Sequence, residues 1–383
     1  MNNAGKAIVT LALLAGFLTA AYFSVTRSEG PALAGWPGKL KGAVQTQELS
    51  GLIAVDVEPY FEDLRVQKIL LDKGFKLQLK RTGSRDMAAS VGLAATANSP
   101  APEFFYTSGV VAAQQIEAAA KKANIASASY SPIYTPLVVA SWLPIANILA
   151  ANDIARETSP GLWQLDLAKL TQAMLDKTRW KDLKKAAAYD VGKSVLVSTT
   201  DIRKSNSAAM YLALTSYSVN GNELVSDRET ARKAALRVAG LFKRQGYQEN
   251  YANGNFDDYL SIGMGKTPLA FIYENQIVSH ALAKKGLSPG MVVLYPQPTV
   301  FNKVVFVAVS DRAKKLGELL ATDTALQHLA VAYGFRIADS AWFVQSAQAV
   351  KLPVPDPLTQ VIDPPSFDLM ADMIEVITRE MAQ

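Results

Sequence analysis

Residues 103–123 read EFFYTSGVVAAQQIEAAAKKA: an aromatic stretch, a Thr-Ser-Gly turn and an alanine-rich segment follow one another. Residues 103–106 predict a short β-strand, and residues 110–123 predict a helix. The same order of strand and helix recurs elsewhere, at 50–56 and 61–72, 75–80 and 85–91, 195–197 and from 205 onward, and 268–273 and 274–285. This alternation predicts an α/β fold of open mixed sheets, largely parallel, with helices on both faces.

The composition excludes several kinds of chemistry. The chain of 383 residues is long enough for two domains, and it contains no cysteine, which excludes disulfides, thiolate metal sites, a cysteine nucleophile and a lipoprotein anchor. Its only histidines are His280 and His328, so the chain has few side chains for a histidine-based metal site or for acid–base catalysis by histidine. We therefore expect no enzyme activity, no metal and no cofactor. The net charge of +5, with both signs interspersed, does not indicate nucleic-acid binding.

Residues 1–30 predict export. Residues 7–25 (AIVTLALLAGFLTAAYFSV) carry no charge, and a helix of this length nearly spans the hydrocarbon core of a bilayer. Two interpretations remain open: a cleaved signal peptide, with an Ala-x-Ala site at 32–34, or an uncleaved anchor, which the long apolar stretch favours. In both, the chain from about Gly35 onward lies outside the cytoplasmic membrane, in the periplasm or at the cell surface.

Two Thr-Pro-Leu motifs, at 135–137 and 267–269, indicate how the chain is divided. Each opens an apolar stretch, and proline is tolerated as the first residue of a strand. If both strands cross between lobes, residues 35–134 and 268–345 form a first lobe and residues 135–267 form a second. Residues 346–383 then form a proline-rich wrapping segment and a C-terminal helix that packs on the body through one apolar face.

Three loops, at 82–85, 107–109 and 198–207, combine hydroxyl side chains with the predicted start of a helix. Free backbone N–H groups at a helix start carry partial positive charge, and hydroxyls and cations beside them add donors. Each loop taken alone is equally explained by ordinary helix capping. In open α/β sheets such loops gather at the carboxyl ends of the strands. Together they predict an anion-binding site formed by Thr82, Ser84, Arg85, Thr107, Ser108, Ser198, Thr199, Thr200, Arg203, Ser205 and Ser207.

The order and spacing of five segments resemble the type II periplasmic solute-binding proteins, the group that includes sulfate, molybdate, phosphate and iron binders. The segments are KLQLKRTGS (76–84), YTSGV (106–110), VSTTDIRKSNS (197–207), PLAFIYENQ (268–276) and LGELLATDTALQHLAVAYGFR (316–336). The resemblance covers about residues 48–340. It implies two α/β lobes joined by two crossing strands, with a solute held in a cleft that closes by hinge motion. It adds Tyr273 to the cleft and implies an ABC-type permease or another membrane complex as partner.

One segment departs from the pattern of this family. Many members have Gly or Ser at the end of the first strand, whereas this chain has Asp56 and Glu58. Two carboxylates at this edge would repel an anion or, as the alternative, contribute to a cation site. We expect an extracytoplasmic protein, tethered by its N-terminal helix, that captures a small anionic solute for transport or sensing. The alternative is a membrane-anchored scaffold or sensor of the same fold, whose cleft or surface binds a protein partner. The uncleaved anchor and the two carboxylates favour that alternative.

Overall fold

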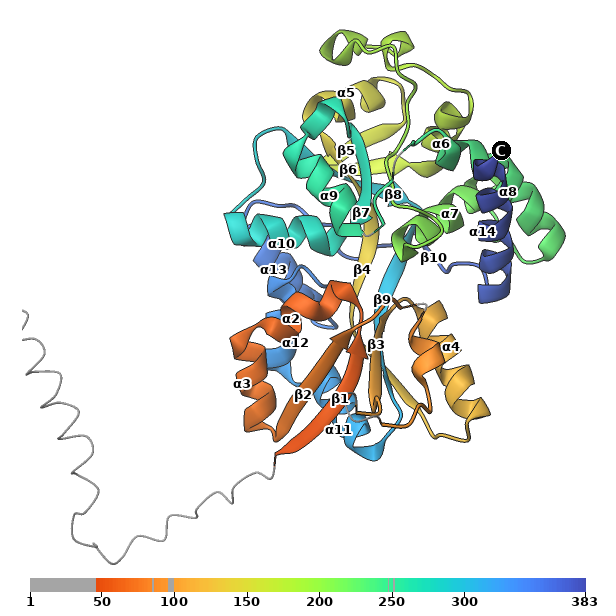
Figure 1. Ribbon diagram of the computed structural model, residues 1–383. Helices are drawn as coiled ribbons and strands as arrows, with labels where there is room; N and C mark the ends of the chain where they lie inside the picture. The colour runs from red at the N-terminus through yellow and green to blue at the C-terminus, as the bar shows by residue number, and fades with distance from the viewer. Residues whose placement is uncertain (1–45, 85, 96–99, 247, 251) are drawn as a thin grey trace, which may run out of the picture. The chain divides into compact units, whose positions relative to one another are not determined.

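The computed structural model describes residues 46–84, 86–95, 100–246, 248–250 and 252–383. Residues from 46 onward belong to one compact unit with two lobes (Figure 1). The predicted signal peptide or anchor at 1–30 lies outside the described residues. Within the described part of the chain, no helix combines the length and hydropathy needed to cross a bilayer.

A mixed sheet runs through both lobes and sets the positions of the loops between them. Its strand order is β2-β1-β3-β9-β4-β8-β6-β5, with β7 beside β4 and β10 beside β9. β1 is parallel to β2 and β3, β6 is parallel to β8, and the remaining pairs apart from β10–β9 are antiparallel. The strands are β1 Gln47–Ile53, β2 Phe75–Arg81, β3 Phe104–Ser108, β4 Ala128–Trp142, β5 Ala155–Ser159, β6 Leu162–Asp166, β7 Leu269–Tyr273, β8 Met291–Gln297, β9 Thr299–Ala308 and β10 Val361–Ile362.

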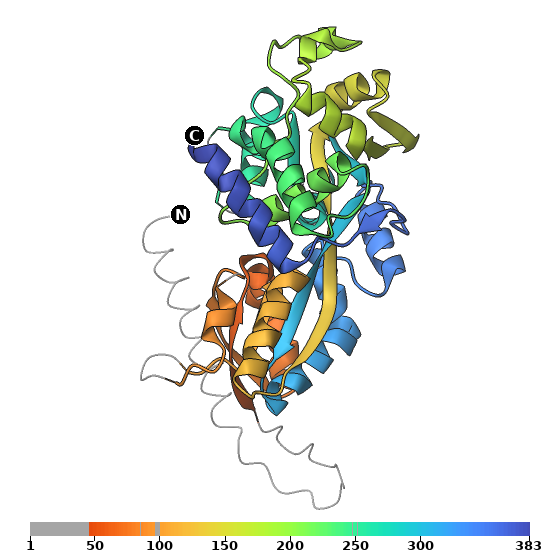
Figure 2. The same ribbon diagram turned by 90° about the vertical axis from the view of Figure 1, so that its right-hand side faces the viewer.

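The long strand β4 joins the two lobes. Its first part, residues 128–136, pairs with β9, and its last part, residues 137–142, pairs with β7 and β8. Figure 2 shows the first part of β4 side by side with β9. We call the part that contains β1, β2 and β3 the first lobe and the part that contains β5 to β8 the second lobe.

The two Thr-Pro-Leu motifs differ in their positions. Pro268 immediately precedes β7 as predicted, but Pro136 lies inside β4, where it pairs with Phe301, so the prediction that it opens a strand was wrong. β7 pairs with the part of β4 that lies in the second lobe. We therefore propose that the chain returns to the first lobe through β9, later than the boundary at 268 given above. The other boundaries, at 35, 135 and 346, stay predictions.

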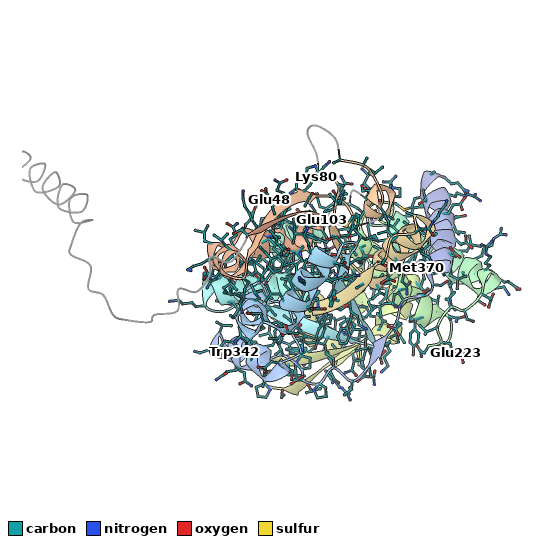
Figure 3. All side chains as sticks on the ribbon, turned by 90° about the horizontal axis from the view of Figure 1, so that it is seen from below. Glu48, Lys80, Glu103, Glu223, Trp342 and Met370 are labelled. Carbon is teal, nitrogen blue, oxygen red and sulfur yellow. The ribbon has the colours of Figure 1, made fainter. Side chains whose placement is uncertain are left out.

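Helices cover the sheet in both lobes (Figure 1). They are α2 Glu58–Glu62, α3 Leu64–Asp72, α4 Val110–Lys122, α5 Leu143–Ala151, α6 Leu167–Leu175, α7 Asn206–Val219, α8 Arg228–Lys243, α9 Ala252–Ser261, α10 Glu274–Lys284, α11 Asp311–Thr322, α12 Thr324–Ala332, α13 Ser340–Ala349 and α14 Phe367–Ala382. The predicted helices at 110–123 and 274–285 are confirmed as α4 and α10. The C-terminal helix also packs on the body as predicted. Met370 (Figure 3), Met373 and Ile377 of α14 are buried in the core of the second lobe, beside α8.

Three local predictions need correction. The helix predicted over 85–91 is reduced to a short 3-10 turn, Met87–Ser90, because a segment this short does not repay the cost of nucleating an α-helix. The strand predicted at 195–197 is absent; the chain there makes an isolated bridge between Ser198 and Ala270 before it turns away. Thr107 and Ser108 belong to β3 rather than to a loop, because β9 continues to pair with them.

Candidate ligand-binding cleft

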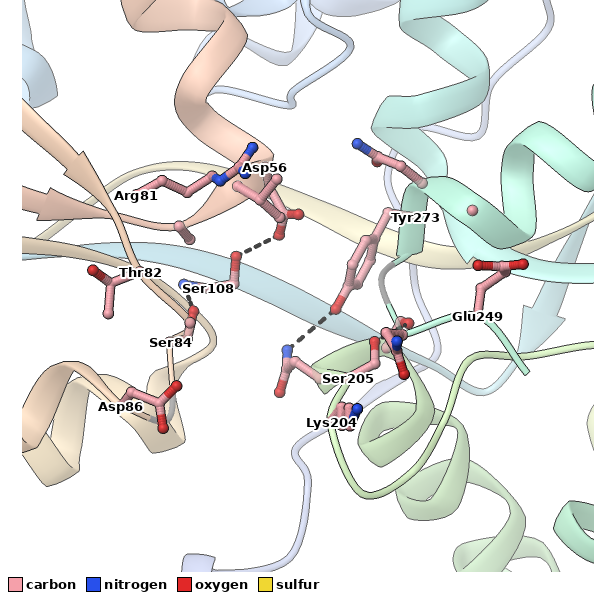
Figure 4. A pocket seen from close by; sticks show the side chains of 18 of the residues that line it. Asp56, Arg81, Thr82, Ser84, Asp86, Ser108, Lys204, Ser205, Glu249 and Tyr273 are labelled. Carbon is pink, nitrogen blue, oxygen red and sulfur yellow. Dashed lines mark hydrogen bonds between the residues drawn. The ribbon is translucent and has the colours of Figure 1, made fainter. Parts of the chain in front are cut away.

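A cavity with a volume of about 620 Å³ lies between the two lobes (Figure 4). Its wall on the first lobe comes from the three residues that follow β1, the end of β2 with the turn that follows, and the last residue of β3. Its wall on the second lobe comes from the start of α7, the end of β7 and the residues Glu249, Asn250, Asn253 and Gly254. The lining residues are Ala54, Val55, Asp56, Arg81, Thr82, Gly83, Ser84, Asp86, Ser108, Arg203, Lys204, Ser205, Asn206, Ser207, Glu249, Asn250, Asn253, Gly254 and Tyr273.

On the first lobe, three polar side chains form a connected group. The hydroxyl of Ser108 donates a hydrogen bond to Oδ2 of Asp56 at 2.5 Å, and the Ser108 backbone N–H donates to Oγ of Ser84 at 3.0 Å. Burial raises the pKa of the Asp56 carboxyl, and the hydrogen bond from Ser108 opposes that rise. Asp56 therefore supplies an acceptor at this wall and gains a proton more readily than an exposed aspartate.

On the second lobe, the cavity meets the N-terminus of α7. The Ser205 hydroxyl does not cap this helix; it pairs with the Ser207 hydroxyl at 2.9 Å, and Ser207 pairs with the Thr200 hydroxyl at 2.7 Å. Asn206 and Ser207, in the first turn, line the cavity. The free N–H groups of a first turn favour negative charge, so this wall offers donors to an anion.

The cations of the cavity differ in how they are paired. Arg203 is held by the buried carboxylate of Asp201 through contacts at 2.8 and 2.5 Å, and this contact lowers the pKa of Asp201. Arg81 contacts Glu58 at 3.1 Å. Lys204 is exposed and lines the cavity, and no carboxylate among the described residues forms an ion pair with it. Lys204 is therefore the cation that is best placed to meet a bound anion.

The two lobes approach each other closely at Gly109. This residue follows β3 with φ +89°, and a Cβ added to it would lie 3.3 Å from Nδ2 of Asn206, the first residue of α7. Asn206 in turn donates to the Tyr273 hydroxyl at 3.2 Å (Figure 4). Nearby, both amide atoms of the buried Asn302 lack a hydrogen-bond partner. The missing side chain of Gly109 thus allows α7 to reach the end of β3.

The structure brings together most of the predicted site residues, and it separates the rest. Seven line the cavity: Thr82, Ser84, Ser108, Arg203, Ser205, Ser207 and Tyr273. Thr107 and Thr200 are buried and do not line it. Ser198 and Thr199 line a second cavity within the second lobe. Arg85 lies outside the described residues.

Sequence reasoning missed six charged or amide side chains that line the same cavity. These are Arg81, Asp86, Asn206, Glu249, Asn250 and Asn253. Arg81 and Asp86 flank the predicted loop at 82–85, so position next to a predicted site residue is a signal that could have found them. Glu249 and its neighbours follow α8 in a segment that no motif distinguishes. Among the described residues, no group of three His, Asp or Glu side chains is arranged to hold a metal ion.

The comparisons with known proteins concern the fold. No family model matches the chain, and no curated protein matches it in sequence. The crystal structure of an ABC transporter from Clostridium perfringens ATCC 13124 matches with a TM-score of 0.53 at 12% identity, covering 87% of this chain and 99% of that one. A periplasmic thiamin binding protein matches with a TM-score of 0.50 at 13% identity, covering 88% of this chain and 97% of that one. The predicted fold is therefore confirmed: this chain has the two-lobed α/β fold of the periplasmic solute-binding proteins.

Proposed function

We propose that this protein is an extracytoplasmic solute-binding protein that captures a small anionic solute between its two lobes and has no enzymatic activity. One observation carries the proposal: a single cavity is lined by polar side chains from both lobes, on either side of the shared strands β4 and β9. A solute in this cavity contacts both lobes only when they are close together, so binding favours the closed arrangement. The similarity to a periplasmic thiamin binding protein in fold supports this role.

The charges of the cavity support a solute with two kinds of polar group. Lys204 and the first turn of α7 provide positive charge and N–H donors for an anionic group. Asp56, on the first lobe, provides an acceptor for hydroxyl or amine groups. A bare inorganic oxyanion would bind to Lys204 and the first turn of α7, but the carboxylate of Asp56 would repel it. An organic anion with hydroxyl or amine groups uses both.

The ligand is tested by calorimetry on a panel of inorganic oxyanions, organic acids, hydroxylated or amino-substituted organic acids and metal chelates. We expect organic anions with donor groups to bind, about tenfold more weakly in Lys204→Met because a hydrogen bond to a charged group is lost. Ser84→Ala, which alters the opposite wall, should weaken binding severalfold. Lys315→Met, at an exposed position outside the cavity, should bind as the native protein does. The site assignment is wrong if compounds bind and neither cavity variant weakens them. If no compound binds, the scaffold function replaces this one.

The location follows from the apolar stretch at 7–25, which we propose tethers the protein to the outer side of the cytoplasmic membrane. An ABC-type permease or another membrane complex is the partner that such a tethered binder would serve. Fractionation and N-terminal sequencing of the mature protein test this. We expect Met1 to be retained in the membrane fraction. A mature N-terminus near residue 35 would show cleavage instead, and recovery from the cytosol would overturn the extracytoplasmic location.

A further inference from the structure

Among the described residues, the cavity between the lobes holds more unpaired negative charge than positive. Arg81 contacts the carboxylate of Glu58 at 3.1 Å. Arg203 contacts the carboxylate of Asp201 at 2.5 Å, and neither of these two carboxylates lines the cavity. The lining residues that form no ion pair with a described residue are Asp56, Asp86 and Glu249, with negative charge, and Lys204, with positive charge. A solute that carries only negative charge would add to this excess.

Asp56 has a carboxylate oxygen that faces the cavity. Its Oδ2 accepts the hydrogen bond from the Ser108 hydroxyl (Figure 4), whereas no described residue donates to Oδ1. Oδ1 is also not one of the buried side-chain atoms that lack a partner, so it is accessible to solvent. Because Asp56 lines the cavity, this oxygen is available to a solute that enters it.

The surroundings of Asp56 favour a positively charged donor over a neutral one. Burial disfavours the charged form of this carboxylate and raises its pKa, and the hydrogen bond from Ser108 offsets only part of that cost. A hydroxyl group of a solute would add a hydrogen bond and leave the negative charge uncompensated. A protonated amine supplies both the hydrogen bond and the opposite charge that a partly buried carboxylate needs.

The wall on the second lobe has the opposite charge. Lys204 is exposed, and it lies two residues before α7, whose first residues Asn206 and Ser207 also line the cavity. The Lys204 ammonium and the free N–H groups of this first turn both favour an anionic group. One cavity of about 620 Å³ therefore offers positions of opposite charge on its two lobes. This volume is in the range of sites that hold small organic ligands.

We propose that the solute is a small zwitterion, whose protonated amine pairs with Asp56 and whose carboxylate or other oxyanion group binds at Lys204 and the first turn of α7. This inference rests on the proposed function and narrows its solute from an anion with hydroxyl or amine groups to one that carries an amine. The amine contacts the first lobe and the anionic group contacts the second. Both ends of the solute therefore favour the closed arrangement of the lobes.

Calorimetry of the full chain in mild detergent at neutral pH tests this inference with compounds that differ in a single group. The probes are ω-amino carboxylates of increasing chain length from glycine to 5-aminopentanoate, together with 2-aminoethylsulfonate and 2-aminoethylphosphonate. Each is compared with the hydroxy compound and the unsubstituted compound of the same length. We expect at least one amino compound to bind, about tenfold or more tightly than both of its counterparts, because only the amine pairs with the Asp56 charge.

Variants on the two walls separate the roles of the two ends of the solute. Asp56→Asn keeps the size of the side chain and removes its charge. It should bind the amino compound about tenfold more weakly and the hydroxy counterpart with nearly native affinity. Lys204→Met should weaken both compounds by a similar factor, because both carry the same anionic group. Asp368→Asn changes an exposed carboxylate of α14 outside the cavity and should bind both compounds as the native protein does.

The outcomes distinguish this inference from the proposed function on which it rests. The inference is wrong if amino and hydroxy compounds bind the native protein equally, or if Asp56→Asn weakens both to the same extent. In either case the cavity still binds an anionic solute, and the proposed function stands. The inference is also wrong, again without loss of the proposed function, if other anions bind and no amino compound does. If neither these probes nor the wider panel of anions and chelates binds, both fail.

Discussion

Gly109 lies close to Asn206 of α7 in the second lobe, and its lack of a side chain has two consequences. Its φ of +89° lies in a region that L-residues rarely adopt, and an added Cβ would press on Asn206. We expect Gly109→Ala to lower the free energy of unfolding by more than about 1 kcal/mol and to weaken solute binding. Gly240→Ala is the control, because Gly240 is exposed on the helix α8 and has open space around it. This variant should instead stabilise the protein by about 0.5–1 kcal/mol. Urea unfolding of both variants measures the difference. Equal effects would contradict this role of Gly109.

Asp56 and Asp201 should respond to pH with opposite signs. The pKa of Asp56 is raised above its ordinary value of 3.8, so the folded state disfavours its charged form. The free energy of unfolding therefore falls as pH rises from 3.8 through the raised pKa. Asp56→Asn carries no charge, so its stability relative to the native protein should increase with pH through that window and then stay constant.

Asp201 is the matched case, because Arg203 lowers its pKa. Its contribution to stability is present above the ordinary pKa and is lost as pH falls through the lowered value. Asp201→Asn should thus be less stable than the native protein at neutral pH, with a difference that shrinks in acid. Thermal unfolding between pH 3 and pH 8 measures both variants. Parallel curves for the two variants would show that these carboxylates are not perturbed as described.

At the scale of elements, a buried ion pair fixes α10 next to the cleft residue Tyr273. Glu274, the first residue of α10, accepts from Arg336 at 2.6 and 2.8 Å and from the Tyr295 hydroxyl at 2.8 Å, and both charged side chains are almost fully buried. Arg336 also exchanges two backbone hydrogen bonds with Tyr134 of β4, at 2.9 and 3.0 Å. The pair therefore connects α10 to the strand that joins the lobes.

Removing one partner of this pair leaves the other charge buried without compensation. We expect Glu274→Gln to lower the free energy of unfolding by about 3–5 kcal/mol. The double variant Glu274→Gln with Arg336→Met should recover part of that loss. Lys233→Met, which breaks an exposed pair with Glu229 on α8, should change it by less than about 1 kcal/mol. Chemical denaturation of the three variants measures these changes in the free energy of unfolding. A Glu274→Gln variant as stable as Lys233→Met would show that the Glu274–Arg336 pair is not needed for stability.

The elements that the sequence predicts best are those with a long periodic pattern or a strong alternation. Residues 110–123 and 75–80 correspond to α4 and β2 within one residue at each end. The segment at 195–197 has strand composition, but its single bridge to β7 depends on a partner more than seventy residues away. Local pattern carries no information on such pairing. For the same reason, Ser198 and Thr199 were assigned to one site with Ser205, although the turn between them directs the two groups to different cavities.

At the scale of the whole molecule, the absence of cysteine makes movement of the lobes measurable. Lys80 on the first lobe and Glu223 on the second are both exposed, as Figure 3 shows. Cysteines introduced at these two positions would be the chain's only thiols, so a donor and an acceptor dye attach only there. Energy transfer between the dyes then reports the distance between the two lobes. A solute that contacts both walls of the cleft binds the closed arrangement of the lobes more tightly than the open one. The ratio of these two affinities sets how far binding shifts the lobes toward the closed arrangement.

We therefore expect energy transfer between dyes at Lys80→Cys and Glu223→Cys to change when solute is added. The solute concentration at half of this change should equal the dissociation constant that calorimetry gives for the same compound. A second pair, Glu223→Cys and Lys243→Cys, places both dyes in the second lobe and should not respond. Lys204→Met should shift the midpoint of the first pair to higher solute concentration by the same factor as its loss of affinity, because the contact that binds the anion is also the one that favours closure. A response in the control pair, or binding without any response in the first pair, would show that capture proceeds within a fixed cleft.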